Sequence, residues 1–195
     1  MITTSTTAST PPTAPTPFPF PQYYSFPPLF SLQPTLQTRH AQLTKWSNLI
    51  LAYCRHHRIF KLSLIDALET ELFYNKVLGR RLEMKDAREV LEGMRREGRV
   101  EWIGGGKGEE GEGGVCWVWW RNVEEWAGVV YDWVDETAQK NTVLTLYELT
   151  ESEATISQEF HHMDPDLLQK ALNHLVKRGK AQVFGQEDQQ GVKFF

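Results

Sequence analysis

EMKDAREVLEGMRREGRVEWIGGGKGEEGEGGVCWVWW, residues 83–120, is the stretch of sequence that decides the fold. Apolar residues recur at three- and four-residue steps in its first part, which predicts a helix over 83–97. Gly98 follows at the position where a glycine commonly ends a helix. Two β-prone runs, 99–102 and 115–120, then enclose a glycine-rich loop, which is the pattern of a β-hairpin. The stretch therefore predicts a helix that leads into a hairpin.

Two further helices are predicted before this stretch. Over 39–57 the apolar residues Leu43, Trp46 and Ile50 recur at helical spacing and make one buried stripe. A shorter helix is expected over 63–72. Three helices followed by a β-hairpin are the element order of a winged-helix domain.

The same order of elements recurs further along the chain. Trp46 and Trp126 lie 80 positions apart, and Gly98 and Gly179 lie 81 positions apart. The second copy is expected to hold helices over 123–138, from 147 onward and over 165–178, and a hairpin over 181–195. A repeat of this length indicates a duplicated structural unit. We therefore predict a mostly α chain with small β-hairpins, of the α+β class, with two tandem winged-helix domains at 39–121 and 122–195.

The N-terminal 38 residues differ from the rest of the chain. They contain no Asp, Glu, Lys, Arg or His and hold nine of the ten prolines, which disfavour helices and central strands. The segment is also rich in aromatic residues, which linkers seldom are. We expect 1–38 to be a disordered or extended segment rich in proline. The residues alone leave two interpretations open: a peptide that docks on another protein, or a linker that folds back on its own domain.

Composition excludes several classes of protein. The 195 residues carry a net charge of −4, and no apolar run approaches the roughly 20 residues of a membrane-spanning helix. No secretory signal is visible, and the two cysteines favour a reducing compartment. The predicted helix over 83–97 balances four cations with five carboxylates, and the wing that follows is acidic. This charge pattern argues against binding of duplex DNA, which requires a basic face.

No motif in the sequence predicts catalysis, a cofactor or a metal site. Residues 106–111 match G-x-G-x-x-G, but they lie between two β-prone runs, whereas a dinucleotide site opens a helix. His161, His162 and Asp164 lie together in one short loop without a closed ligand set. We expect these histidines to lie at the surface or to cap helices, and we expect the protein not to be an enzyme.

The tryptophans of the first hairpin suggest a contact between the domains. Because successive side chains of a strand point to opposite faces, Trp117 and Trp119 share one face of the sheet. Val118 and Trp120 share the other face, and one of the two faces is expected to lie outside the first domain's own core. It would then be buried by the second domain or by a partner, and we favour the second domain.

Several short motifs in a fixed order resemble one known family. They are Phe26-Pro27-Pro28-Leu29-Phe30, Gln33-Pro34, Thr38-Arg39, Trp126, Tyr131-Asp132-Trp133, Thr145-Leu146-Tyr147-Glu148-Leu149, Glu159-Phe160-His161 and Gly191-Val192-Lys193-Phe194-Phe195. Together they resemble the vacuolar protein-sorting subunit twenty-five family, the small tandem winged-helix subunit of the ESCRT-II endosomal sorting complex. The resemblance covers the chain from about residue 24 to its end.

The resemblance implies a non-catalytic adaptor and a set of partners. In this family two copies join one copy each of the two larger ESCRT-II subunits, and the Pro-Pro motif docks into a groove on a larger subunit. This role falls on Phe26, Pro27, Pro28, Leu29 and Phe30. Some relatives have tyrosine where this chain has Phe30, so any contact of that hydroxyl is missing here. The first domain is expected to share in this docking.

The second domain is expected to recruit the nucleating subunit of ESCRT-III. Acidic side chains near its second helix, Glu148, Glu151 and Glu153, are candidates for meeting a basic helix of that subunit. The implied process is the sorting of ubiquitinated cargo into multivesicular bodies. The implied location is the cytoplasm with recruitment to the endosomal membrane, through partners and without direct membrane insertion.

Two alternatives remain from the residues alone. A winged-helix DNA-binding transcription regulator would share the fold but would require a basic surface. A generic ligand of WW or SH3 domains would use the proline-rich tail, in which Pro12-Thr13-Ala14-Pro15 supplies a P-x-x-P pattern.

Overall fold

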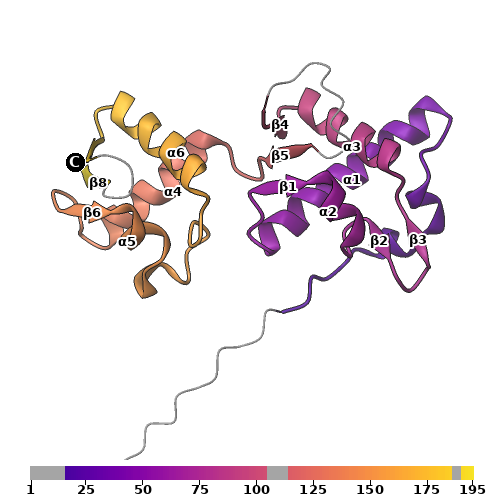
Figure 1. The fold of residues 1–195 in the computed structure, drawn as a ribbon, viewed down its shortest axis with the longest axis horizontal. Coiled ribbons are helices and arrows are strands. Elements are labelled where there is room, and N and C mark those ends of the chain that lie inside the picture. Colours follow the sequence, from indigo (N-terminus) through magenta and orange to yellow (C-terminus); the bar gives the residue numbers. More distant parts are fainter. Residues whose placement is uncertain (1–15, 105–113, 186–189) are drawn as a thin grey trace, which may run out of the picture.

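The fold is described by a computed structural model, in which residues 16–104, 114–185 and 190–195 are placed. Two units, each of three helices and a three-stranded sheet, follow one another along the chain (Figure 1). The first unit contains α1 (Leu36–His56), β1 (Lys61–Ser63), α2 (Leu64–Glu69), α3 (Met84–Arg96), β4 (Val100–Trp102) and β5 (Val115–Val118). The second contains α4 (Val123–Glu136), β6 (Val143–Thr145), α5 (Leu146–Thr150), α6 (Pro165–Lys177), β7 (Ala181–Phe184) and β8 (Gly191–Phe194).

The two sheets have the same topology. Both are antiparallel, with strand order β1-β5-β4 in the first unit and β6-β8-β7 in the second. Leu62 pairs with Cys116 in one sheet, and Leu144 pairs with Val192 at the equivalent place in the other. Three helices and such a sheet in each unit confirm the predicted α+β class with tandem winged helices. We call the units the first and second domain, with the proposed limits 39–121 and 122–195.

The helix ends follow from local sequence, and the expected limits hold to within a few residues. Gly98 and Gly179 lie just beyond α3 and α6 with φ of +72° and +70°, a conformation that favours glycine. Asn122 and Thr145 cap α4 and α5 through capping boxes with Glu125 and Glu148. The largest differences are at α1, which begins at Leu36 rather than residue 39, and at α2, which ends at Glu69 rather than residue 72.

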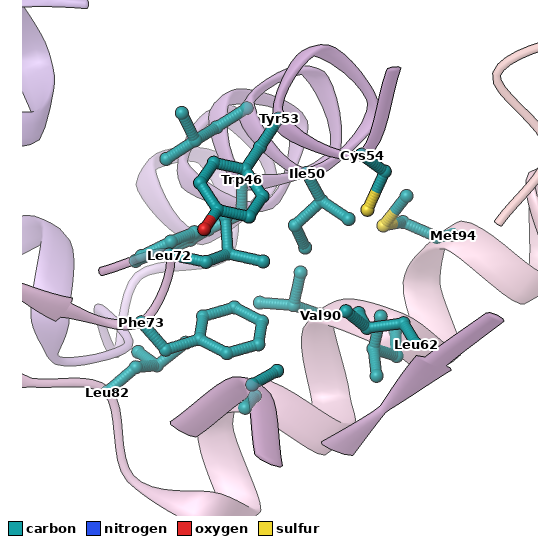
Figure 2. Close-up of a cluster of buried hydrophobic side chains, with 14 of the residues drawn as sticks. Trp46, Ile50, Tyr53, Cys54, Leu62, Leu72, Phe73, Leu82, Val90 and Met94 are labelled. Carbon is teal, nitrogen blue, oxygen red and sulfur yellow. The ribbon is translucent and has the colours of Figure 1, made fainter. Parts of the chain in front are cut away.

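The core of the first domain lies between α1, α3 and the sheet. Figure 2 shows Trp46 and Ile50 of α1 facing Phe73, Val90 and other apolar side chains. Trp46 is completely buried, and its ring contacts those of Phe30 and Phe73. Burial of each large apolar side chain contributes about 1.5–3 kcal/mol to folding. This cluster therefore holds the first domain together.

The second core includes residues of the first domain. Phe60 and Trp117 are both 5 % exposed and pack into the cluster formed by α4, α6 and the second sheet. Trp119 packs against the same cluster and stacks on Trp117, with ring centroids 5.7 Å apart. The expectation that the second domain buries one face of this strand is confirmed, and the structure identifies it as the face of Trp117 and Trp119.

The segment before α1 is folded back on the first domain. It forms two short 3₁₀ helices, η1 (Gln22–Ser25) and η2 (Pro27–Phe30), and the side chains of Phe18 and Phe20 pack on Tyr53 of α1. The expectation of a disordered or extended 1–38 is wrong for 16–38, because aromatic burial on α1 offsets the entropy of ordering this chain. Residues 1–15 lie outside the described part.

Candidate partner-binding surfaces

The predicted docking motif is divided by burial. Phe26 is 60 % exposed, and Pro27 and Pro28 are also exposed. Leu29 and Phe30 are only 4 % and 2 % exposed, because they belong to the core of the first domain. Of the five residues predicted to dock, Leu29 and Phe30 are therefore buried in the free chain, and Phe26, Pro27 and Pro28 are exposed. We call the exposed turn of Phe26, Pro27 and Pro28 the docking turn, after the role predicted for it, and Leu29 and Phe30 anchor it in the core.

Contacts of Leu29 and Phe30 hold the docking turn against the core of the first domain. The ring of Phe30 packs edge-on against the rings of Trp46 and Tyr24, at centroid distances of 5.7 and 5.4 Å. The indole N–H of Trp46 donates to the carbonyl oxygen of Leu29 at 3.1 Å. The Phe30 ring therefore lies in this core and is not offered at the surface of the free chain.

A small hairpin beside the docking turn was not predicted. Strands β2 (Tyr74–Asn75) and β3 (Arg80–Arg81) pair, and η2 packs against β3. Asn75 donates to the carbonyl oxygen of Tyr24 at 3.1 Å, and its cross-strand partner is Arg80. Paired residues share a face of the hairpin, so the exposed Arg80 flanks the docking turn. No sequence signal marked these residues, because each strand is only two residues long and shows no alternation of apolar and polar residues.

The three acidic candidates of the second domain have different surroundings. The carboxylate of Glu148 accepts hydrogen bonds from the backbone N–H of Thr145 at 2.6 Å and from its hydroxyl at 2.9 Å. These two bonds lower the pKa of the Glu148 carboxyl below its ordinary value. Glu151 lies 2.7 Å from Nδ1 of His162. Glu153 begins η3 (Glu153–Thr155) and forms no ion pair within the described residues. All three residues are exposed, but Glu148 is engaged in capping α5 and Glu151 pairs with His162, so Glu153 has the least engaged carboxylate of the three.

A shallow cleft of about 800 Å³ lies between the two domains. Its walls include Arg58 and Lys61 from the first domain and Tyr147, Glu151 and Leu168 from the second. Lys61 crosses the cleft floor to both Asp164 and Asp166, at 2.8 and 2.9 Å. The cations and carboxylates of the cleft are largely paired with each other, so it offers no concentrated charge to a small ligand.

Glu159 of the second domain joins the two domains through hydrogen bonds from two arginines. One of its carboxylate oxygens accepts Nε of Arg55 on α1 at 3.0 Å, and the other accepts Nε of Arg121 at 2.6 Å. Partial burial would raise the pKa of Glu159, but hydrogen bonds from Arg121 and Arg55 outweigh it and hold the pKa below its ordinary value. Glu159 is therefore ionised at neutral pH and fixes one domain to the other.

The histidine cluster has structural contacts. His161 bonds to the hydroxyl of Thr155 through Nδ1, His162 pairs with Glu151, and Asp164 caps α6. Over the placed residues, no three His, Cys, Asp or Glu side chains gather as metal ligands do. The same residues provide no helix long and apolar enough to cross a bilayer.

Several cations of the third helices have partners within the chain. On α3, Lys85 and Arg95 pair with Glu83 and Glu92 at 2.9 and 2.8 Å. On α6, Lys170 lies over the rings of Trp117 and Trp119 of the first domain. These cations are used within the chain, which agrees with the sequence argument against duplex binding.

The arrangement described above has close counterparts among known proteins. The family described as "ESCRT-II complex subunit" matches residues 23–164. Vacuolar protein-sorting-associated protein 25 of Homo sapiens is 40 % identical over 160 residues, which are 82 % of this chain and 88 % of that protein. The chain belongs to the ESCRT-II complex subunit family.

Other members agree in sequence and in fold. The relative from Danio rerio is 38 % identical over 160 residues, 82 % of this chain and 88 % of that protein. A crystal structure of subunit VPS25 of the endosomal trafficking complex ESCRT-II superposes with a TM-score of 0.75 at 29 % identity, over 90 % of this chain and 98 % of that one. A crystal structure of the endosomal complex ESCRT-II (VPS22/VPS25/VPS36) contains a chain with a TM-score of 0.74 at 29 % identity, over 89 % and 98 %. The relatives are named as sorting subunits and none as an enzyme.

Proposed function

We propose that this chain is a non-catalytic adaptor subunit of ESCRT-II that docks on the two larger subunits through Phe26, Pro27 and Pro28. The observation that carries this proposal is an exposed Phe-Pro-Pro turn that buried neighbours hold in place, in a member of the ESCRT-II family. A related subunit is crystallised in a complex with VPS22 and VPS36. Two copies of this chain would bind, one on each larger subunit.

The physics of the turn suits docking. Two prolines restrict the backbone before binding, so less entropy is lost when the turn is fixed on a partner. The Phe26 ring supplies a large apolar area, and such rings dominate the energetics of many interfaces. The neighbouring Arg80 places a cation beside the turn, which suits a partner groove with a carboxylate at its edge.

Replacement of Phe26 by alanine tests the docking. We expect Phe26→Ala in the full chain to weaken binding to the co-purified larger subunits by at least about tenfold, while thermal unfolding of the free chain stays nearly unchanged because the ring is exposed. Val143→Ala removes a similarly exposed apolar side chain from the second domain and serves as the matched control. Undiminished assembly of Phe26→Ala would contradict the proposal, and native mass measurement of the wild-type assembly reports the two-to-one-to-one stoichiometry.

Phe30 is unsuitable as a docking probe. Its truncation removes a core ring and should cost about 3–5 kcal/mol of stability. Loss of assembly by Phe30→Ala would therefore report unfolding of the first domain as well as any lost contact.

We further propose that the second domain recruits the nucleating subunit of ESCRT-III, with Glu151 and Glu153 facing a basic helix. Because Phe60 and Trp117 of the first domain complete the core of the second, the test uses the full chain within assembled ESCRT-II. Reversal of both charges, Glu151→Lys with Glu153→Lys, is expected to weaken binding several-fold and to reduce its salt dependence. Glu136→Lys alters an exposed carboxylate on α4 and is the control. Unchanged affinity and salt dependence of the double variant would refute this assignment.

The cellular role follows from these contacts. We propose that the chain acts in the cytoplasm, that ESCRT-II brings it to the endosomal membrane, and that it links the complex to ESCRT-III during sorting of ubiquitinated cargo into multivesicular bodies. Membrane attachment would come from its partners.

A further inference from the structure

One buried amide connects the docking turn to the first domain. We propose that Gln42 of α1 is a positioning residue that holds the docking turn in the shape required for partner binding. This inference rests on the proposed docking function of Phe26, Pro27 and Pro28.

All the hydrogen bonds of the Gln42 side chain go to the backbone that follows the docking turn. Its Nε2 lies 3.1 Å from the carbonyl oxygen of Pro28, 2.8 Å from that of Leu29 and 2.9 Å from that of Ser31. Its Oε1 accepts the backbone N–H of Gln33 at 3.0 Å. An amide has two N–H bonds, so at least one of them is shared between carbonyls. A single side chain thus bridges both ends of residues 28–33.

The orientation of this amide is determined by its neighbours. Rotation by 180° would place Oε1 against three carbonyl oxygens and Nε2 against the N–H of Gln33, which would leave only repulsive contacts. Gln42 is 6 % exposed, and a polar group in such a place is unfavourable unless it is fully bonded. An apolar residue at this position would also pack on the buried face of α1, but it could not form hydrogen bonds to the turn.

Two other side chains bind the same three carbonyls. Nε2 of Gln33 lies 3.3 Å from the oxygen of Pro28 and 3.0 Å from that of Ser31, and the indole of Trp46 donates to Leu29. Each carbonyl therefore has two side-chain donors within reach, one of which is Gln42. The prolines restrict φ of residues 27 and 28 only, so the path of the chain after them depends on these bonds together with the burial of Leu29 and Phe30.

The consequence for binding is pre-organisation. When only a fraction of the free protein has the competent conformation, the apparent dissociation constant rises by the inverse of that fraction. Loss of the Gln42 donors would let residues 28–33 sample other conformations, while Phe26 and both prolines remain present. The affinity for the larger subunits should fall although no contacting residue has changed.

The test compares variants of the full chain by calorimetric titration of the co-purified larger subunits. Gln42→Glu keeps the shape and the acceptor for Gln33 but loses both donors, and we expect about tenfold weaker binding and faster amide hydrogen exchange over residues 29–33. Gln33→Ala removes the second side-chain donor to the carbonyl oxygens of Pro28 and Ser31. Gln33 is half-buried, so we expect the variant to keep its fold and to bind about threefold more weakly. Ser47→Ala, at a buried polar residue of α1 outside this network, should bind like the wild type.

A double-mutant cycle separates positioning from a general effect on stability. In a Phe26→Ala background the same Gln42→Glu change should cause little further loss, because the contact that it positions is gone. An equal loss in both backgrounds would overturn the proposal, as would wild-type affinity of Gln42→Glu. Where Gln42→Glu fails to fold, wild-type affinity of Gln33→Ala overturns it.

The same variants separate this inference from the proposed docking function. If Phe26→Ala alone binds normally, the docking function itself fails. If Phe26→Ala weakens binding and the glutamine variants do not, only the present inference fails.

Discussion

Neighbouring residues of one motif have opposite roles in this protein. Phe26 and Phe30 are four positions apart, yet the first is 60 % exposed and the second is 2 % exposed. Both are phenylalanines in a proline-rich stretch, and residue type alone does not separate them. The difference arises because the short helix η2 turns only one of its sides toward Trp46 and Tyr24.

The ionisation of Glu159 predicts a specific dependence of stability on pH. Its pKa is below the ordinary value in the folded chain, so its contribution is present above the unfolded-state pKa of about 4.3 and is lost as the pH falls through the folded-state pKa. We expect Glu159→Gln to lower the free energy of unfolding at pH 7 by at most about 1 kcal/mol, since the carboxylate is partly screened by water. The difference from the wild type should vanish in acid.

Urea denaturation at a series of pH values measures this difference. Glu153→Gln alters a nearby exposed carboxylate and should match the wild type throughout. A gap for Glu159→Gln that persisted unchanged in acid, or no gap at pH 7, would show that the bridge to Arg55 and Arg121 does not stabilise the fold.

At the scale of elements, α3 contains one glycine and is followed by another, and the two have opposite requirements. Gly93 lies inside the helix, and a Cβ there would meet no atom within 4 Å. Gly98 lies beyond the helix end with φ of +72°, where any other residue is strained. We expect Gly93→Ala to stabilise the protein by about 0.5–1 kcal/mol and Gly98→Ala to destabilise it by about 1 kcal/mol.

Thermal or urea unfolding of the two variants checks the sign of each change. Each variant is the control for the other, since both substitutions add the same methyl group in or just after α3. Two shifts in the same direction would mean that helix propensity and the left-handed turn do not govern this element.

At the scale of the whole molecule, the two domains are joined by more than the chain. The rings of Phe60 and Trp120 lie tilted against each other with centroids 4.7 Å apart, and both contact Trp126 of α4. Glu159 and Lys61 add ion pairs across the same boundary. The position of the second domain is therefore set by that of the first. In the proposed complex, docking through the first domain would determine where the second domain presents its acidic surface.

The sequence predicted the elements well and the burial of the docking motif incompletely. The limits of α3, α4 and α6 were correct to within two residues, because caps and helical periodicity are local signals. The hairpin β2–β3 was missed, since its strands are two residues long and carry no alternation. Glu148 was chosen as a surface acid, although T-x-x-E at 145–148 matches a capping box and indicated its local role.

By itself, the sequence determined the duplicated helix and hairpin units, the uncharged aromatic start of the chain and the resemblance to an endosomal sorting family. These follow from periodicity, composition and short motifs, which depend on residues close together in the chain. Only the tertiary structure decided which half of Phe26–Phe30 faces outward, that Gln42 binds the turn, and that the second core includes Phe60 and Trp117. Each of these depends on segments that are distant along the chain and come together only when apolar surfaces are buried in three dimensions.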